Sequence, residues 1–451
     1  MPSAGGSLLT IRPGRPLAGS FTPPGDKSIT HRAYLMGWLA RGETVVEGVN
    51  PGADCRATLA AAAALGAQVA VAPGGVRIVG CEGHPREAEG VLDCGNSGTT
   101  LRLLAGPLAA LAGVSVLTGD ASLRRRPVAR IVEPLRRMGA QLWARDGDRL
   151  PPLVIRGAAL SPLDLTLTVA SAQVASCVLL AGMFATGVTT VALPGPARDH
   201  TERMLPAFGV PVRLGPARDG PPGGRTVSLT GPAHPVATRV RVPGDFSAAA
   251  FFLAAAAATP GSVVTARDVD LNPTRTGLLG VLERMGAQVE RTHVREEGGE
   301  PVGDVTVTGP DRLKPCDIEA AQVPALVDEV PAWVVAATAA RGRSRLCGAQ
   351  ELRVKESDRL AVLAAGLAGL GVAVEELPDG LVVTGGRVGG GRVAAADDHR
   401  IAMAFAVLAG RADGPVTVSG AAGIPTSYPG FAATLAALGG EVEGAGVEVG
   451  P

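Results

Sequence analysis

The chain has 451 residues, too many for one ordinary hydrophobic core, and fits two domains of roughly 200 residues each. Hydrophobic residues make up 46% and charged residues 19%, which excludes disorder over most of the length. The 42 basic and 42 acidic residues leave no net charge, and this argues against a nucleic-acid-binding protein, which usually carries a basic excess.

The sequence shows no signal for secretion, membrane insertion or metal binding. Its N-terminus has no basic stretch followed by an apolar core, and the apolar run at residues 248–258 is about half the length of a membrane-spanning helix. The six cysteines lie far apart, without a CxxC pair or clustered histidines. We therefore expect a cytoplasmic protein with buried, unpaired cysteines and no metal site.

The predicted elements repeat along the chain. After a strand at residues 7–11, an Ala/Leu-rich helix, a Val/Thr-rich strand, a second helix ending in Gly and another strand follow one another. Such copies begin near Gly25, Asn96, Ser171, Asp245, Asp328 and Asp398. Their second helices end at Gly66, Gly139, Gly209, Gly286, Gly371 and Gly439. Glycine there suits a left-handed helix cap, and the spacing, roughly 70 to 85 residues, suits a βαβαββ unit.

Six copies predict an α/β fold with two pseudo-threefold domains of three copies each. A stretch rich in Gly and Pro at residues 215–236 separates the third copy from the fourth. We place the first domain at residues 22–240 and the second at residues 1–21 plus 241–451. Two chain crossings, near residues 21–25 and 239–244, would then form the hinge.

The first copy opens with GDKSITHR at residues 25–32. Ser28 is a plausible N-cap, Arg32 lies one helical turn further on the same face, and Lys27 stands at the mouth. Free N–H groups and the helix dipole at such a start favour a phosphate or a carboxylate. For this segment alone, a capped helix with a solvated Lys and Arg is the alternative.

Further copies also open with polar residues: NSGTTLR at 96–102, SAQ at 171–173, GDFS at 244–247 and DHR at 398–400. Together they predict several anion-binding helix starts facing a shared cleft, and hence a substrate with several negative charges. The segment LRRRP at 123–127 adds three arginines, of which one could clamp a carboxylate or phosphate with two hydrogen bonds.

Two segments of the second half carry candidate acids and bases. In RVKESDR at 353–359, helical spacing places Lys355 and Glu356 on the same side as Arg359, where a carboxylate among cations could exchange protons. A surface ion-pair network is the alternative. Asp328 sits in an otherwise apolar stretch and is a candidate to accept a hydrogen bond from a substrate hydroxyl.

These motifs, with RRRPVAR at 124–130, RDHTERML at 198–205 and DDHR at 397–400, resemble those of 5-enolpyruvylshikimate-3-phosphate synthases, in the same order over essentially the whole chain. The resemblance implies a two-domain inside-out α/β barrel with six βαβαββ repeats, three per domain. It implies a transferase of the shikimate pathway of aromatic amino acid biosynthesis that moves the enolpyruvyl group from phosphoenolpyruvate to shikimate 3-phosphate without a cofactor. The family is the target of glyphosate. We expect a monomer.

The resemblance also assigns ligands, motif by motif. Shikimate 3-phosphate would contact Lys27, Ser28, Arg32, Ser171, Gln173, Arg198, Asp328 and Lys355. Phosphoenolpyruvate would contact Lys27, Gly98, Arg126, Gln173, Arg359 and Arg400. Glu356 would donate and accept the proton with help from Lys27, and Asp328 would orient or deprotonate the 5-hydroxyl.

Two positions depart from the pattern: Thr426 stands where some members carry a lysine, and Ala172 where some carry a second serine. Both changes resemble the second sequence class of the family. One alternative is the sister enzyme that acts on UDP-N-acetylglucosamine, which uses a cysteine about where this chain has Ser122 to Arg126 and no cysteine. Another is a non-catalytic protein that binds sugar phosphates.

Overall fold

The computed structural model describes residues 8–217 and 223–443 of the chain. Contacts within the chain divide it into two compact units. The early unit comprises Gly25–Val242 and the short segment Glu297–Glu300. The late unit comprises Met1–Pro24, Pro243–Glu296 and Pro301–Pro451. The hinge between two moving domains, near residues 21–25 and 239–244, stays a prediction.

Among the described residues, the strands of the early unit form three sheets with the orders β14-β3-β5-β4, β6-β7-β9-β8 and β10-β11-β13-β12. In each sheet the first pairing is parallel and the other two are antiparallel. The strands are β3 (Glu43–Glu47), β4 (Gln68–Ala72), β5 (Gly75–Val79), β6 (Leu92–Asp93), β7 (Val114–Thr118), β8 (Gln141–Ala144), β9 (Leu150–Arg156), β10 (Asp164–Thr166), β11 (Gly187–Leu193), β12 (Val212–Pro216), β13 (Arg225–Gly231) and β14 (Arg239–Arg241).

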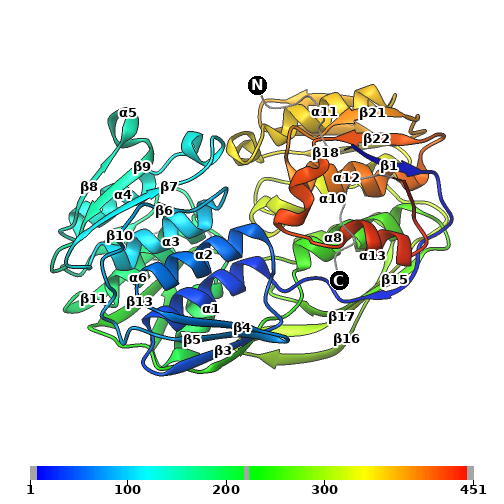
Figure 1. Cartoon of the computed structure of the whole chain (residues 1–451). Coiled ribbons are helices and arrows are strands. Elements are labelled where there is room, and N and C mark those ends of the chain that lie inside the picture. The colour runs from blue at the N-terminus through cyan, green and yellow to red at the C-terminus, as the bar shows by residue number, and fades with distance from the viewer. Residues whose placement is uncertain (1–7, 218–222, 444–451) are drawn as a thin grey trace. The chain divides into compact units, whose positions relative to one another are not determined.

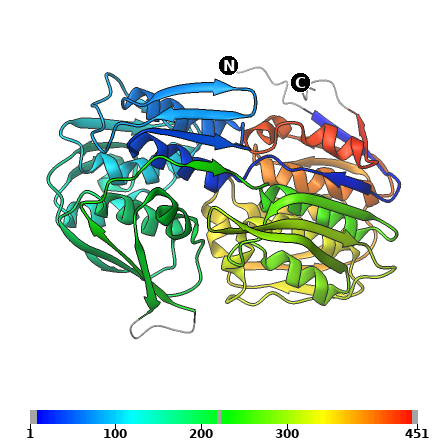
Figure 2. The ribbon, with the colours of Figure 1, turned by 90° about the horizontal axis from the view of Figure 1, so that it is seen from below.

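The late unit repeats this strand order in the sheets β2-β15-β17-β16, β18-β20-β19 and β21-β22-β1-β23. Where the second of these has three strands, Ile318 makes a parallel bridge to Leu346 in place of a first strand. The strands are β1 (Leu8–Arg12), β2 (Ala18–Phe21), β15 (Val263–Asp270), β16 (Gln288–Glu297), β17 (Glu300–Thr308), β18 (Arg343–Leu346), β19 (Ala373–Leu377), β20 (Gly380–Thr384), β21 (Gly391–Ala394), β22 (Val416–Ser419) and β23 (Glu441–Glu443). Figure 2 shows the yellow-green strands β16 and β17 across the front of this unit.

The first helix of each repeat lies inside its unit. These helices are α1 (Lys27–Leu39), α3 (Gly98–Leu108) and α6 (Ala172–Gly182) in the early unit and α8 (Phe246–Ala258), α10 (Val330–Ala339) and α12 (His399–Leu408) in the late unit. All thirteen residues of α8 are buried, and α8, α10 and α12 pack against one another (Figure 1). A helix that is apolar on every side belongs in a core. The helices are therefore inside and the sheets outside, as predicted.

Small residues allow these inner helices to approach closely. A Cβ atom on Gly106 of α3 would lie 2.3 Å from the carbonyl oxygen of Cys177 on α6, closer than any real Cβ contact. Glycine is therefore required where these two helices cross. Only 3% of the residues are aromatic, and several of these, such as Trp38, Trp333 and Phe251, are buried on the inner helices.

The second helix of each repeat ends as predicted. These helices are α2 (Ala53–Ala64), α4 (Ala129–Arg137), α7 (His200–Met204) with the 3-10 turn η2 (Leu205–Phe208), α9 (Gly277–Met285), α11 (Arg359–Gly369) and α13 (Phe431–Ala437). The six glycines that follow all have positive φ: Gly66 (106°), Gly139 (113°), Gly209 (75°), Gly286 (100°), Gly371 (76°) and Gly439 (103°). The left-handed cap is confirmed in all six repeats.

Short helical turns complete the fold. They are α5 (Arg145–Asp148), η1 (Leu123–Arg125), η3 (Val323–Ala325), η4 (Val327–Glu329), η5 (Gln350–Val354), η6 (Ala409–Arg411) and η7 (Ala421–Thr426). Within the described ranges, the helices are all too short or too polar to cross a bilayer.

Candidate active site

Polar residues at the starts of the inner helices act as N-caps, but the capping residue is not always the one predicted from the sequence. The N-cap of α1 is Asp26, whose Oδ1 accepts the Ile29 N–H at 2.8 Å. The prediction that Ser28 caps this helix is wrong, because the Asp26 carboxylate takes that place and Ser28 lies in the first turn. Ser171 caps α6, as its position at the start of the third copy suggested.

Lys27 begins α1 and forms an ion pair with Asp54 in the first turn of α2, with Nζ 3.0 Å from Oδ2. The side chains are 16% and 10% exposed, so the pair is largely shielded from water. Sequence reasoning missed Asp54. A carboxylate in the first turn of a helix was its only signal, and that feature is common without function.

Arg32 is buried within α1, with 3% of its surface exposed. Its Nε donates to Thr201 Oγ1 at 2.7 Å, its Nη2 to Ser176 Oγ at 2.9 Å and its Nη1 to the Ser28 carbonyl at 3.0 Å. Burial lowers the pKa of Arg32 to about 10, and the positive charge of Arg198 acts in the same direction. The two arginines predicted to bind shikimate 3-phosphate therefore act on each other electrostatically.

Three predicted phosphoenolpyruvate ligands of the early unit lie together around Arg102. Its Nη1 donates to Gln173 Oε1 at 2.8 Å, and a Cβ on Gly98 would lie 2.7 Å from the same nitrogen and 3.6 Å from Nη1 of Arg126. Arg126 is fixed in turn by Asn96, whose backbone carbonyl accepts from its Nη1 at 3.1 Å. Sequence reasoning did not assign Arg102 or Asn96, although both lie in the NSGTTLR motif.

A buried chain of polar groups connects α1, α2 and α3 beside Lys27. His31 Nδ1 lies 2.7 Å from Thr58 Oγ1, which lies 2.6 Å from Thr100 Oγ1. Burial lowers the pKa of His31 to about 3, so the imidazole is neutral at physiological pH. His31 stands four residues after Lys27, and Thr58 four after Asp54, so the two helices meet in two successive polar contacts.

In the late unit, Arg359 at the start of α11 is 1% exposed and faces three carboxylates. Its Nε donates to Asp398 Oδ2 at 2.8 Å, its Nη2 to Glu356 Oε2 at 2.7 Å and its Nη1 to Asp328 Oδ1 at 3.4 Å. Burial alone lowers the pKa of Arg359, but the three negative charges outweigh it and raise the pKa above its usual value. Asp398, which also caps α12, was seen only as part of DDHR and was not assigned a role.

Arg400 and Asp328 also lie together. Arg400 Nη1 donates to the Asp328 backbone carbonyl at 2.9 Å, and its Nη2 lies 3.9 Å from Asp328 Oδ2. Asp328 lies in the 3-10 turn η4, before α10 begins at Val330. Four predicted site residues of the late unit, Asp328, Glu356, Arg359 and Arg400, thus form one cluster.

The prediction for Lys355 is wrong in its local geometry. Lys355 was expected on the same side as Arg359 at helical spacing, but α11 begins only at Arg359, and Asp358 is its N-cap. Residues before the cap do not follow the helical period. Lys355 Nζ instead lies 2.8 Å from Glu351 Oε1, in an exposed pair. Thr426, the position of the missing lysine, is half-buried at the end of η7.

Comparison with known proteins decides the family. The family model EPSP synthase (3-phosphoshikimate 1-carboxyvinyltransferase) matches residues 11–435. The chain belongs to the EPSP synthase family. A 3-phosphoshikimate 1-carboxyvinyltransferase of Anaeromyxobacter sp. (strain K) is 51% identical over 97% of this chain and 98% of its own length. One from Acidithiobacillus ferrooxidans (strain ATCC 53993 / BNL-5-31) is 50% identical over 94% of this chain and 96% of its own.

The solved structures agree with this membership. An EPSP synthase structure from Acinetobacter baumannii superposes with a TM-score of 0.86 at 41% identity, covering 98% of this chain and all of the other. The six-repeat, inside-out α/β fold of EPSP synthases is therefore confirmed for this chain. Membership of this family also decides against the UDP-N-acetylglucosamine enzyme and the non-catalytic sugar-phosphate binder.

Proposed function

We propose that this chain catalyses the reaction for which the family is named. In this proposal, most of the anion-binding residues lie in the early unit, and the carboxylates that transfer protons lie in the late unit. The enolpyruvyl group of phosphoenolpyruvate is transferred to the 5-hydroxyl of shikimate 3-phosphate, and phosphate is released. The observation that carries this conclusion is the family match over residues 11–435. Both substrates are phosphorylated carboxylates, and cations held by hydrogen bonds suit such groups.

The early unit supplies most of the anion binding. We assign shikimate 3-phosphate to the eight residues Lys27, Ser28, Arg32, Ser171, Gln173, Arg198, Asp328 and Lys355, of which six lie in this unit. Phosphoenolpyruvate is assigned to Lys27, Gly98, Arg126, Gln173, Arg359 and Arg400. The hydrogen bonds of Arg102 and Asn96 to Gln173 and Arg126 support this assignment, because they fix two of these side chains before a substrate arrives.

The late unit supplies the proton chemistry. The substrate hydroxyl oxygen bonds to C2 of phosphoenolpyruvate while C3 takes up a proton; the tetrahedral intermediate then loses phosphate and a proton from C3. We assign Glu356 as proton donor and acceptor, with Lys27 assisting, and Asp328 to orient or deprotonate the 5-hydroxyl. In support, the buried Arg359 donates hydrogen bonds to Glu356, Asp328 and Asp398, so one cation holds both assigned carboxylates in the same cluster.

The substitution Glu356→Gln tests the assignment, because the amide keeps the size and the hydrogen-bonding capacity of the side chain but cannot transfer the proton. Turnover, measured as phosphate released from both substrates without added metal, should fall by about a hundredfold or more. Binding of shikimate 3-phosphate, measured by calorimetry, should survive. Glu375→Gln, at an exposed carboxylate of the same unit, is the control. Unchanged turnover in Glu356→Gln removes this residue from the mechanism.

The setting of the enzyme is also a proposal. We propose that it works in the cytoplasm as a monomer and does not bind nucleic acid. The equal numbers of basic and acidic residues, 42 of each, support the last point. Sedimentation of the purified protein with and without DNA tests the monomer and the lack of nucleic-acid binding together.

A further inference from the structure

Arg32 is a buried cation whose hydrogen-bond acceptors, among the described residues, are all neutral. Thr201 and Ser176 accept from its Nε and Nη2, and the Ser28 carbonyl accepts from Nη1. In the part of the chain that the structure describes, no carboxylate forms an ion pair with Arg32. Burying a charge without a counter-charge is unfavourable, so this guanidinium is prepared for an anion from outside the chain.

The hydroxyls of Ser176 and Thr201 contact each other as well as Arg32. Ser176 Oγ and Thr201 Oγ1 lie 2.6 Å apart, so each contacts both the guanidinium and the other hydroxyl. Both side chains are buried. A guanidinium has five N–H donors in one plane, and the three bonds described occupy one donor on each nitrogen. Two donors, one on Nη1 and one on Nη2, are thus left in a plane whose orientation the hydroxyls set.

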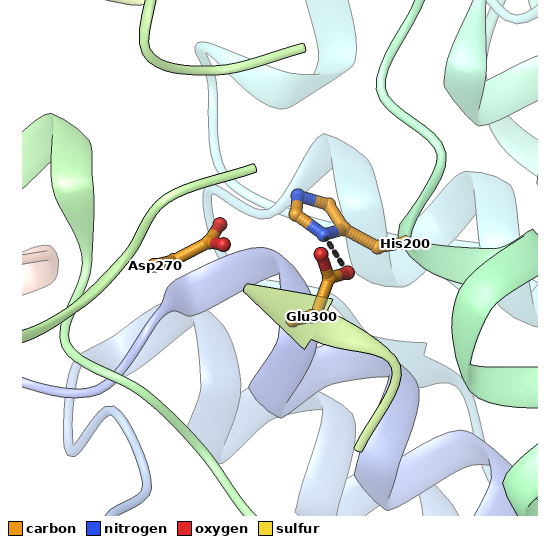
Figure 3. A group of neighbouring side chains, drawn as sticks. All are labelled: His200, Asp270 and Glu300. Carbon is orange, nitrogen blue, oxygen red and sulfur yellow. Dashed lines mark hydrogen bonds and ion pairs between the residues drawn. The ribbon is translucent and has the colours of Figure 1, made fainter. Parts of the chain in front are cut away.

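Thr201 is itself held by the residues on either side of it in α7. His200 Nδ1 lies 2.7 Å from Glu300 Oε1, and both side chains are buried (Figure 3). Glu202 accepts from Arg225 Nη2 at 3.0 Å. Because α7 has only five residues, its own backbone bonds would hold it weakly. These side-chain bonds fix the turn that carries Thr201.

Arg203 adds a third anchor to the same turn. Its Nη1 donates to the Gly299 carbonyl at 3.0 Å, and its Nε lies 2.9 Å from Asp199 Oδ2. Residues 200 to 203 thus each make a polar side-chain contact, and that of Thr201 is directed to the proposed substrate ligand Arg32. The RDHTER segment therefore contributes more than the predicted ligand Arg198, because it also places the Thr201 hydroxyl against Arg32.

We propose that Thr201 and Ser176 are positioning residues that set the affinity for the phosphorylated acceptor by orienting Arg32. Neither touches the substrate in this proposal; both act through the guanidinium. The inference rests on the proposed function, in which Arg32 binds shikimate 3-phosphate. Loss of either hydroxyl should leave an N–H of Arg32 without its acceptor and let the plane rotate.

The experiment compares Thr201→Val and Ser176→Ala with the wild type. A hydrogen bond to a charged group is worth enough that KM for shikimate 3-phosphate should rise roughly tenfold in each. The KM for phosphoenolpyruvate and kcat should change by less than about threefold, because Arg32 is assigned to the acceptor alone. Thr201→Ser, which keeps the hydroxyl, should restore the wild-type KM. These shifts are measured in the phosphate-release assay and confirmed by calorimetry with shikimate 3-phosphate.

Thr189→Val is the matched control. Thr189 is buried in the same unit, and its hydroxyl has no hydrogen-bond partner among the described residues, so its loss removes a buried oxygen without touching Arg32. A wild-type KM in Thr201→Val and Ser176→Ala, or an equal rise for both substrates, overturns the proposal. Failure of the wild type to release phosphate refutes the proposed function instead, and the two failures are distinguishable.

Discussion

Two buried arginines, one in each unit, show two ways of holding the same side chain. Arg32 is 3% exposed and meets two hydroxyls and a carbonyl, whereas Arg359 is 1% exposed and meets three carboxylates. Burial lowers the pKa of Arg32 to about 10, while the carboxylates around Arg359 outweigh burial and raise its pKa. The guanidinium of Arg32 thus has only neutral hydrogen-bond acceptors among the described residues, whereas that of Arg359 has three carboxylate acceptors.

The difference separates two tasks of the proposed reaction. A buried arginine without an ion-pair partner, such as Arg32, favours binding of an anion, which suits the binding of a phosphorylated acceptor by the early unit. Arg359 already has three carboxylate acceptors, so it attracts a further anion less strongly and instead orients these carboxylates. Arg359 was predicted only as a phosphoenolpyruvate ligand, and that stays a prediction; what the structure adds is that its side chain also donates to Glu356 and Asp328.

Arg359→Met should have the largest effect on stability. It leaves Asp398, Glu356 and Asp328 close together without their shared cation, and removal of one member of a buried ionic network costs about 3–5 kcal/mol. Urea unfolding at pH 7.5 measures the loss. Arg343→Met is the control, because Arg343 and Glu375 form an exposed pair of the same unit, worth about 0–1 kcal/mol. A loss no larger than in the control would contradict the description of the carboxylate cluster as a network held by Arg359.

The repeat architecture could be predicted from the sequence because it depends on local chemistry. Glycine adopts positive φ more readily than other residues, so six helix-ending glycines at similar spacing indicated six repeats. All six glycines have positive φ in the structure. The cap of α1 was misassigned because Asp26 and Ser28 are both good capping residues two positions apart, and sequence alone does not choose between them.

The surroundings of the site residues could not be predicted in the same way. The hydroxyl partners of Arg32 lie 144 and 169 residues further along the chain, on α6 and α7, and no local pattern connects them. Lys355 was misplaced for a different reason: helical spacing was extended across residues that precede the helix. Motifs identified which residues matter, and the packing of distant elements decided what each one contacts.

Arg32→Met tests the role of the buried arginine of the early unit, as Arg359→Met does for that of the late unit. Because no carboxylate within residues 8–217 and 223–443 forms an ion pair with Arg32, the unfolding free energy without ligand should change by less than about 1–2 kcal/mol, much less than for Arg359→Met. The stabilisation by shikimate 3-phosphate, about 2.7 kcal/mol at a hundredfold excess over Kd, should be lost. Thermal unfolding with and without shikimate 3-phosphate measures both. A stabilisation equal to that of the wild type would show that Arg32 does not bind the acceptor.

His31→Asn tests a second effect of burial in the early unit, the neutral state of the His31 imidazole. Burial holds the pKa of His31 near 3 in the folded state, against 6.5 for an ordinary histidine, so the unfolded chain binds one more proton between these values. Stability is therefore lost as pH falls from 6.5 towards 3, by about 2 kcal/mol at pH 5. The substitution should remove that part of the difference in unfolding free energy between pH 7.5 and pH 5.

The comparison of two pH values within one variant cancels the loss of packing that His31→Asn also causes. His84→Asn, at an exposed histidine of the same unit, is the control. An unchanged pH dependence in His31→Asn would mean that the imidazole is charged in the fold at pH 5, although Lys27 and Arg32 are nearby positive charges.

Lys355→Met should have the smallest effect on stability and is the sharpest test of an assigned ligand. Lys355 and Glu351 form an exposed pair four residues apart, so their loss should cost no more than about 0.5 kcal/mol. Glu351→Gln breaks the same pair but keeps the lysine. If Lys355 binds shikimate 3-phosphate, KM for that substrate should rise severalfold in Lys355→Met and stay near the wild-type value in Glu351→Gln. Because the two variants lose the same ion pair, an equal response in both would place Lys355 among ordinary surface residues and leave the early unit to bind the acceptor phosphate alone.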